Sequence, residues 1–168
     1  MTRGRRLLAT ALLCCLLPAG CAARAPKGSP APIDFAFEIG GEQHRLAELR
    51  GRPVALVLMR TSEIPSQIFM ADLKEAFAKR AGKTRFLVLT VEPLEKPFVA
   101  PYVEAEKLPF PVGVAEPDVA LGRSSLGVVP VVPCSYFIGS QGELVSAAAG
   151  AIPAREIEQR IEQLDRRY

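Results

Sequence analysis

The sequence predicts a single α/β domain in which a central mixed sheet is flanked by helices. Two continuous apolar blocks, residues 54–59 and 86–91, have the composition of strands that are covered on both faces. An amphipathic segment over residues 67–80 lies between the blocks and has helical spacing. Two β-rich runs then precede a second amphipathic segment at the C-terminus. This β-α-β order followed by β-β-α predicts one sheet.

The first 20 residues have the pattern of a secretory signal peptide. Three arginines come first, an apolar run covers residues 7–17, and the small pair Ala19-Gly20 precedes Cys21. Removal of the three arginines takes the basic residues from 21 to 18, against 18 acidic residues, so the mature net charge is 0. The absence of a basic cluster in the sequence argues against a nucleic-acid partner.

The residues LPAGC at the end of this segment resemble the lipobox of bacterial lipoproteins. The resemblance implies that Cys21 carries a lipid anchor and that the protein faces the periplasm of a bacterial cell envelope. Because Ala22 follows the cysteine, the resemblance favours the outer membrane over the inner one. Ordinary secretion with cleavage nearby is the alternative. Residues 21–32 then form the anchor and a flexible tether rich in Pro and Ala, and residues 33–168 form the folded domain.

The helices of this domain follow from hydrophobic periodicity. In the predicted helix over residues 67–80, the apolar side chains share one face and most charged side chains lie on the other. Shorter helices are expected near residues 102–106 and 118–123, in a region punctuated by prolines. Pro153 suits the first turn of a last helix, which packs its apolar face against the sheet.

Turn chemistry places the remaining strands. The runs 134–138 and 143–149 flank the turn Ser140-Gln141-Gly142, which predicts a β-hairpin. Gly40-Gly41 is expected to form a turn between two short strands, because the sequence around it lacks the lysine of a phosphate-binding loop. We therefore expect no nucleotide ligand.

Five stretches carry a resemblance to a known family: LAELRGRPVALVLMRTSEIPSQ, FLVLTVEP, LPFPVGVAEPD, VVPCSYFIGSQGELV and GAIPAREIEQRIEQL. They are similar, in this order, to segments of the thioredoxin-like redoxins of the TlpA and ResA type, and the resemblance covers nearly all of residues 36–166. It implies a thioredoxin-like fold with a cis peptide bond before Pro133, beside the groove where the family holds a partner chain. The family keeps a CxxC motif just after the first core strand, where a helix N-terminus favours a thiolate. At those positions this sequence has Glu63-Ile64-Pro65-Ser66.

Cysteine counting limits the redox chemistry of the mature domain. Cys14 and Cys15 lie in the signal segment and Cys21 is the expected anchor, so Cys134 is the one thiol left. No intramolecular disulfide is possible in the mature chain.

Glu63 and Ser66 occupy the degenerate redox-site positions, and Glu63 admits two interpretations. Its carboxylate is either a functional anion at a helix N-terminus or a helix-start acid beside Ser62 or Ser66 as the cap. The second is favoured, because a general acid or base needs a partner and a pocket that the sequence does not display.

Cys134 is the candidate catalytic residue. In the family its position lies beside the active-site loop, so its thiol is expected to face Glu63 and Ser66. The alternative, which is favoured, is an inert, partly buried cysteine at the start of a strand. Without a neighbouring cation the thiol stays protonated, and a nearby Glu63 would raise its pKa further.

The sequence predicts no cofactor and no metal. His44 is the single histidine and has no cysteine or carboxylate companions at ligand spacing.

Two functions are consistent with these residues. The first is a membrane-anchored, non-redox binding or assembly factor that holds an exported protein partner beside Pro133. The second is a thiol-disulfide exchange activity through Cys134 alone, which needs a resolving thiol from outside the chain.

Overall fold

The computed structural model describes residues 31–80 and 82–168, so the expected signal peptide and Cys21 lie outside the described residues. The elements in chain order are β1 Ala36–Ile39, β2 Glu42–Arg45, the 3-10 helix η1 Leu46–Leu49, β3 Val54–Met59, α1 Ile64–Arg80, β4 Arg85–Thr90, the 3-10 helix η2 Pro93–Glu95, α2 Lys96–Glu106, β5 Val112–Ala115, α3 Pro117–Ala120, β6 Cys134–Ile138, β7 Leu144–Ala149 and α4 Ala154–Arg167. No helix in this part of the chain has the length and apolarity to cross a bilayer.

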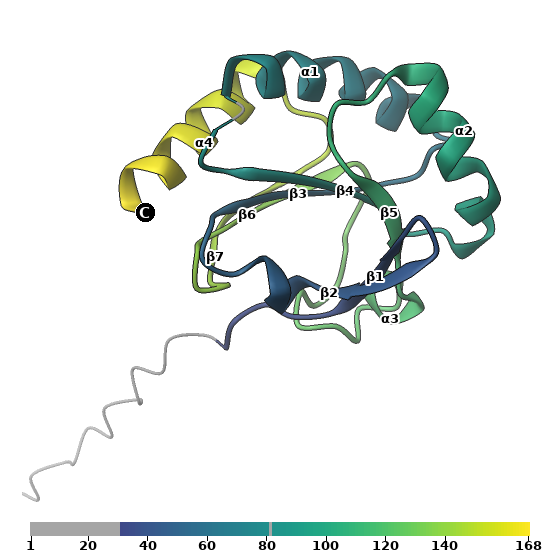
Figure 1. The fold of residues 1–168 in the computed structure, drawn as a ribbon, viewed down its shortest axis with the longest axis horizontal. Helices are drawn as coiled ribbons and strands as arrows, with labels where there is room; N and C mark the ends of the chain where they lie inside the picture. Colours follow the sequence, from purple (N-terminus) through teal and green to yellow (C-terminus); the bar gives the residue numbers. More distant parts are fainter. Residues whose placement is uncertain (1–30, 81) are drawn as a thin grey trace, which may run out of the picture.

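The strands form one seven-stranded mixed sheet with the order β2-β1-β5-β4-β3-β6-β7. The three central strands β5, β4 and β3 are parallel, and the other pairings are antiparallel. Figure 1 shows α1, α2 and α4 on one side of the sheet and α3 on the other. The expected mixed sheet flanked by helices is confirmed, and its parallel centre places the ends of β3 and β4 at one edge.

The sheet separates two hydrophobic cores. The helix-side core packs alternate residues of β3, including Val57 and Met59, against α1, α2 and α4. The α3-side core contains the other alternation, including Leu56 and Leu58, together with η1 and α3. Because β3 is buried on both faces, its six residues are apolar without a break, which is what made this strand predictable.

The structure extends or shortens several predicted elements. The strands 54–59 and 134–138 are confirmed as predicted. Helix α1 begins at Ile64, three residues before the predicted start, and α2 begins at Lys96 rather than near residue 102. Helix α2 was mostly missed because two prolines lie within its span and Val99 is its one buried residue.

Strand β5 was not predicted, because it has four residues and its packing depends on a glycine. A Cβ atom on Gly113 would collide with the carbonyl oxygen of Glu38 in β1. The β1–β5 pairing therefore requires glycine at position 113. Because glycine is depleted in strands, this residue did not indicate a strand in the sequence.

Candidate functional site

The loops after β3 and β4 meet at the carboxyl edge of the parallel strands, where α/β folds place ligand and active sites. Residues 60–63 form the loop between β3 and α1, and η2 follows β4 on the neighbouring strand. A third segment, residues 128–133, reaches the same edge just before β6, which pairs with β3. These three segments form the candidate site.

A buried carboxylate fixes the first two segments to each other. Glu95, at the end of η2, is 6% exposed. Its two oxygens accept the backbone N–H of Thr61 at 2.7 Å and that of Ser62 at 2.9 Å, and Oε1 also accepts the Ser62 hydroxyl at 2.7 Å. The hydroxyl of Thr90, the last residue of β4, donates to Oε2. The loop that follows β3 is thus held by the segment that follows β4.

The Glu95 carboxyl is ionised at any ordinary pH. Burial raises its pKa, but the hydrogen bonds from Thr90, Ser62 and Thr61 outweigh burial and lower the pKa to about 2. Sequence reasoning assigned Glu95 no role, because the acid lies in a proline-punctuated stretch without periodicity. The one available signal was an acidic residue shortly after a buried strand.

Glu63 is the last residue before α1 and pairs with a cation in the same loop. Its Oε1 lies 2.9 Å from Nη1 of Arg60, and the two side chains are 34% and 44% exposed. Its backbone carbonyl accepts the N–H of Gln67 at 3.0 Å and so begins the helical ladder. The hydrogen bond to Glu63 raises the pKa of Arg60. Glu63 therefore has the charged partner that the sequence did not display.

Neither serine caps α1, contrary to the expected helix-start arrangement. The Ser62 hydroxyl donates to Glu95, as described above. Ser66 is fully buried, and its Oγ accepts the backbone N–H of Arg60 at 3.3 Å. Both hydroxyls stabilise the 60–63 loop rather than the first helical turn.

The peptide bond between Val132 and Pro133 is cis, as the family resemblance implied. A cavity of about 260 Å³ lies beside it, between the loop after β3 and residues 129–132. Arg60 and Glu63 line one side, and Val91 and Ala120 complete it. The structure therefore brings Glu63 and the segment preceding Pro133 to one cavity.

Cys134 does not face Glu63 and Ser66, and this expectation is wrong. Its side chain belongs to the α3-side core, whereas α1 packs on the opposite face of the sheet. The alternation of β6 decides the direction, because Cys134 and Tyr136 point to one face and Phe137 to the other. The residue is 2% exposed.

The thiol of Cys134 is accordingly protonated at neutral pH. Burial raises its pKa to about 11, although hydrogen bonds with Tyr136 and with the backbone of Leu58 act in the opposite direction. The predicted rise in pKa is therefore correct, but its cause is burial and not the charge of Glu63.

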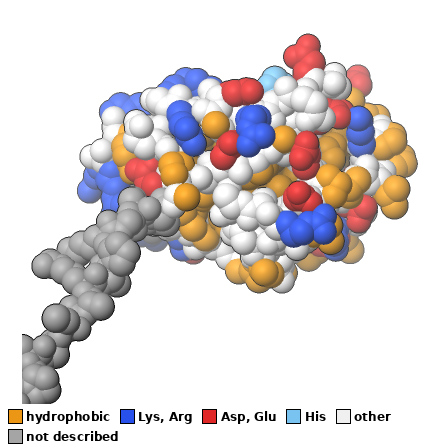
Figure 2. Space-filling view, turned by 90° about the horizontal axis from the view of Figure 1, so that it is seen from below, with side chains coloured by type: hydrophobic (Ala, Val, Ile, Leu, Met, Phe, Trp, Pro, Cys, Tyr) orange, Lys and Arg blue, Asp and Glu red, His pale blue; other side chains and the backbone are white. Residues whose placement is uncertain are grey.

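Large exposed hydrophobic side chains surround the candidate site. We call the following set the apolar rim: Ile64, Ile68, Leu94, Phe98, Leu121, Val128 and Val131. Its most exposed members are Leu94, at 81%, and Val128, at 79%. Five members lie on one of the site's segments or immediately next to a residue that lines the cavity, and the other two, Ile68 and Phe98, lie on α1 and α2. Figure 2 shows hydrophobic side chains gathered toward the right-hand end of the molecule, the end at which α2 lies in Figure 1.

The described residues contain no group of three or more His, Cys, Asp or Glu side chains that could hold a metal ion. His44 stacks on Phe37 with ring centroids 5.7 Å apart, and its Nδ1 lies 3.6 Å from a carboxylate oxygen of Glu48. The histidine is thus a packing residue of the β1–β2 hairpin.

Comparisons with known proteins agree with this fold. No family model matches the chain. The thiol-disulfide oxidoreductase ResA of Geobacillus kaustophilus is 27% identical over 139 residues, which cover 82% of this chain and 77% of that protein. A DsbF homologue from Corynebacterium diphtheriae superposes with a TM-score of 0.69 at 16% identity, over 79% of this chain and 85% of that one. The exposed lipoprotein thioredoxin Etrx1 of Streptococcus pneumoniae gives 0.63 at 23% identity, over 78% and 99%.

The mixed sheet with helices on both faces is the thioredoxin-like architecture that the family resemblance implied. The sequence similarity to ResA extends over most of the domain. The chain has the thioredoxin fold and is similar in sequence to thiol-disulfide oxidoreductases of the ResA type.

Proposed function

We propose that this chain is a non-redox binding or assembly factor that holds an extended segment of an exported protein at the cavity beside Pro133. The observation that carries the proposal is the apolar rim, because it concentrates large exposed hydrophobic side chains around one cavity. Exposed apolar patches of this kind mark protein interaction sites in soluble domains. The rim needs no thiol to act.

The backbone beside the cavity supports an extended partner. Among the described residues, the C=O groups of residues 128–132 and the N–H groups of all of them except Pro130, which has none, make no hydrogen bond to another backbone group. Unpaired groups on an extended segment are a template for a partner strand, which gains affinity from main-chain hydrogen bonds and specificity from side-chain pockets. The cavity lined by Arg60 and Glu63 would receive one side chain of that strand.

A dithiol mechanism needs two cysteines, and residues 33–168 contain one, Cys134. We propose that Glu63 and Ser66 replace the cysteine pair at the start of α1. The alternative, exchange through Cys134 alone, requires a thiolate that can reach a partner disulfide. Burial at 2% exposure and a pKa of about 11 oppose it.

We further propose that Cys21 anchors the domain in the bacterial envelope, with the outer membrane favoured. The arginine-led signal pattern and LPAGC support this location. The structural similarity to Etrx1, an exposed lipoprotein thioredoxin, is consistent with it. Replacing Cys21 by Ala should leave the precursor uncleaved or release a soluble form in a membrane fractionation. Normal membrane retention of that variant would contradict the anchor.

The binding role is tested by photo-crosslinking of the full chain in its native envelope. A photoreactive phenylalanine replaces Val131 in the rim, or Leu144, which is 44% exposed on the edge strand β7, as the matched control. We expect a discrete exported polypeptide to be captured at 131 and not at 144. In the 131 background, Ile68→Lys and Leu94→Lys should each reduce capture at least fivefold.

Equal capture at the two positions, or capture that ignores both rim charges, would refute the rim as the binding surface. The same experiment in a Cys134→Ser background separates the two functions. Unchanged capture supports the binding factor, and loss of capture supports a mixed disulfide through Cys134.

A further inference from the structure

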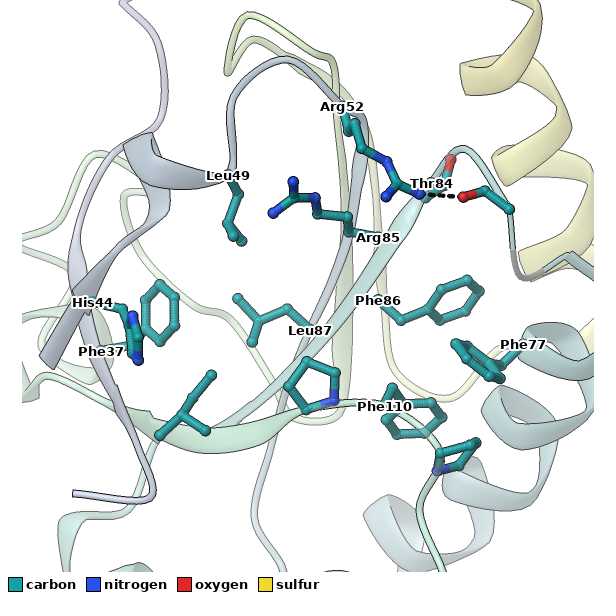
Figure 3. A pocket seen from close by; sticks show the side chains of 14 residues that line it. Phe37, His44, Leu49, Arg52, Phe77, Thr84, Arg85, Phe86, Leu87 and Phe110 are labelled. Carbon is teal, nitrogen blue, oxygen red and sulfur yellow. Dashed lines mark hydrogen bonds between the residues drawn. The ribbon is translucent and has the colours of Figure 1, made fainter. Parts of the chain in front are cut away.

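A second cavity, of about 500 Å³, lies where β4 begins, at the opposite edge of the sheet from the candidate site. Strand β5 starts opposite Val88, so the first three residues of β4, 85–87, have no strand on that side. The space is enclosed by the β1–β2 hairpin, by η1 and by the loop that precedes β5 (Figure 3). Its volume is within the range of ligand pockets for small molecules.

The walls of this cavity are largely apolar. Phe77, Phe86 and Phe110 form an aromatic cluster, with centroid distances of 5.0 Å between Phe77 and Phe86 and 5.5 Å between Phe77 and Phe110. Phe37 and Leu87 close the other side, as Figure 3 shows. Such walls bind hydrocarbon and exclude water.

Among the described residues that line the cavity, Arg52 and Arg85 carry the full charges. No Asp or Glu belongs to this lining, and within residues 31–80 and 82–168 neither Arg52 nor Arg85 forms an ion pair. Arg52 donates Nε to the carbonyl oxygen of Lys83 at 2.8 Å and Nη2 to that of Gly82, both neutral acceptors. Within the described residues, neither arginine therefore has a carboxylate within 4.0 Å.

Arg85 carries the strongest signal for a ligand. Its Nε is buried and has no hydrogen-bond partner among the described residues. Buried polar side-chain atoms in native proteins are normally satisfied, so an orphaned donor calls for an acceptor from outside the chain. In Figure 3 the Arg85 side chain reaches over the cavity toward Leu49, above Leu87.

We propose that this cavity binds a small apolar carboxylate, an alkyl or aryl chain with one acid group, whose carboxylate lies on Arg85. A guanidinium binds a carboxylate through two parallel N–H donors, which would satisfy Nε and leave the chain against the aromatic walls. A neutral hydrocarbon would leave the orphaned donor unpaired, and a multiply charged phosphate compound would place charge against the phenylalanines. The site is separate from the groove beside Pro133 and does not depend on its function.

The test is photoaffinity labelling of the full chain in nanodiscs of zwitterionic phosphatidylcholine. The probe is decanoate with a diazirine at its alkyl end, and its neutral match is the corresponding decanol. We expect decanoate to label residues that line this cavity, and decanol to label them at least tenfold less. Leu49→Trp, which fills the cavity without changing its charge, should abolish labelling.

The variant Arg85→Gln should reduce decanoate labelling at least tenfold, and Arg85→Lys should retain part of it. Arg123→Gln is the control, since Arg123 pairs with Asp118 on α3 and does not line the cavity. Circular dichroism reports whether each variant is folded. Equal labelling by decanol, full labelling of folded Arg85→Gln, or labels confined to other surfaces would overturn the proposal. A label displaced only by extended peptides would overturn it too, in favour of a strand added to the open edge of β4.

Discussion

The carboxylate of Glu95 joins two segments that are more than thirty residues apart in the chain. Its oxygens accept hydrogen bonds from Thr61, Ser62 and Thr90, and these contacts fix the loop that precedes α1. A carboxylate with several donors is a far better acceptor than the amide of the same shape, which turns one of its two ends into a donor.

Glu95→Gln should therefore lower the free energy of unfolding by about 3 kcal/mol at pH 7. The folded pKa is about 2, against 4.5 for an ordinary glutamate, so the stabilisation by the charge is complete above pH 4.5 and disappears as the pH falls toward 2. Urea unfolding at pH 7 and pH 3 measures the effect, and the difference between wild type and variant should be smaller at pH 3. Glu104→Gln, an exposed change on α2, is the control. A pH-independent difference would contradict this account of Glu95.

Cys134 is the residue at which burial decides chemistry. With a pKa of about 11, only about one thiol in a thousand is ionised at pH 8. We expect iodoacetamide to modify the Cys134 peptide at least a hundredfold more slowly in the native chain than in 6 M guanidinium, as measured by mass spectrometry. Rapid native labelling would show that the thiol is reachable and would revive single-thiol exchange.

At the scale of residues, the sequence predicted the positions of Glu63, Ser66 and Pro133 in the fold better than it predicted their contacts. Glu63, Ser66 and Pro133 are all at the carboxyl edge of the sheet, as the resemblance implied. The direction of the Cys134 side chain was wrong, because strand alternation depends on register and the register is set by the whole sheet. Glu95 was missed because its partners are backbone groups, which have no sequence signature.

At the scale of elements, the start of α1 brings together Glu63 and Ser66, the two residues that we propose to replace a cysteine pair. Glu63 and Ser66 are three residues apart across the first turn of the helix, and Arg60 contacts both. Residues at this spacing lie on one face of a helical turn.

Glu63→Cys together with Ser66→Cys should therefore create a pair that is close enough to bridge. Air oxidation of the purified double variant should remove two protons and two electrons, which pass to oxygen, seen as a mass loss of about 2 Da that dithiothreitol reverses. The control is Glu75→Cys with Lys79→Cys, an exposed pair of α1 away from the helix start. Failure of the first pair to bridge in a folded protein would show that the loop has lost the redox geometry.

The predictable elements share a physical cause, and so do the missed ones. Strands β3 and β6 are buried along their whole length, so their apolar runs mark both ends. Helix α4 alternates buried and exposed faces and has a clear helical period. Helix α2 and strand β5 each bury few side chains and depend on neighbours, so tertiary contacts decide them.

At the scale of the whole molecule, the number of thiol groups limits the reductase activity. A dithiol reductase needs one thiolate to attack a disulfide and a second to resolve the mixed disulfide. Residues 33–168 contain Cys134 alone. The purified chain should therefore not reduce insulin faster than dithiothreitol does by itself, in the standard turbidity assay. Turnover by the unmodified protein that disappears in Cys134→Ser would contradict the binding role and establish single-thiol catalysis.

The described chain enters the domain at the end of the sheet opposite the candidate site. The backbone N–H of Ile33 donates to the carbonyl oxygen of Gly142 at 2.7 Å, and Gly51 donates to Ser140 in the same turn. This turn lies at the start of β3, whereas the groove beside Pro133 lies past its end, about 20 Å away for a six-residue strand. The described chain therefore enters the domain at the end of the sheet that carries the second cavity, and the cavity beside Pro133 lies at the opposite end. With the anchor proposed at Cys21, the site beside Pro133 is the part of the domain that lies farther from the tether.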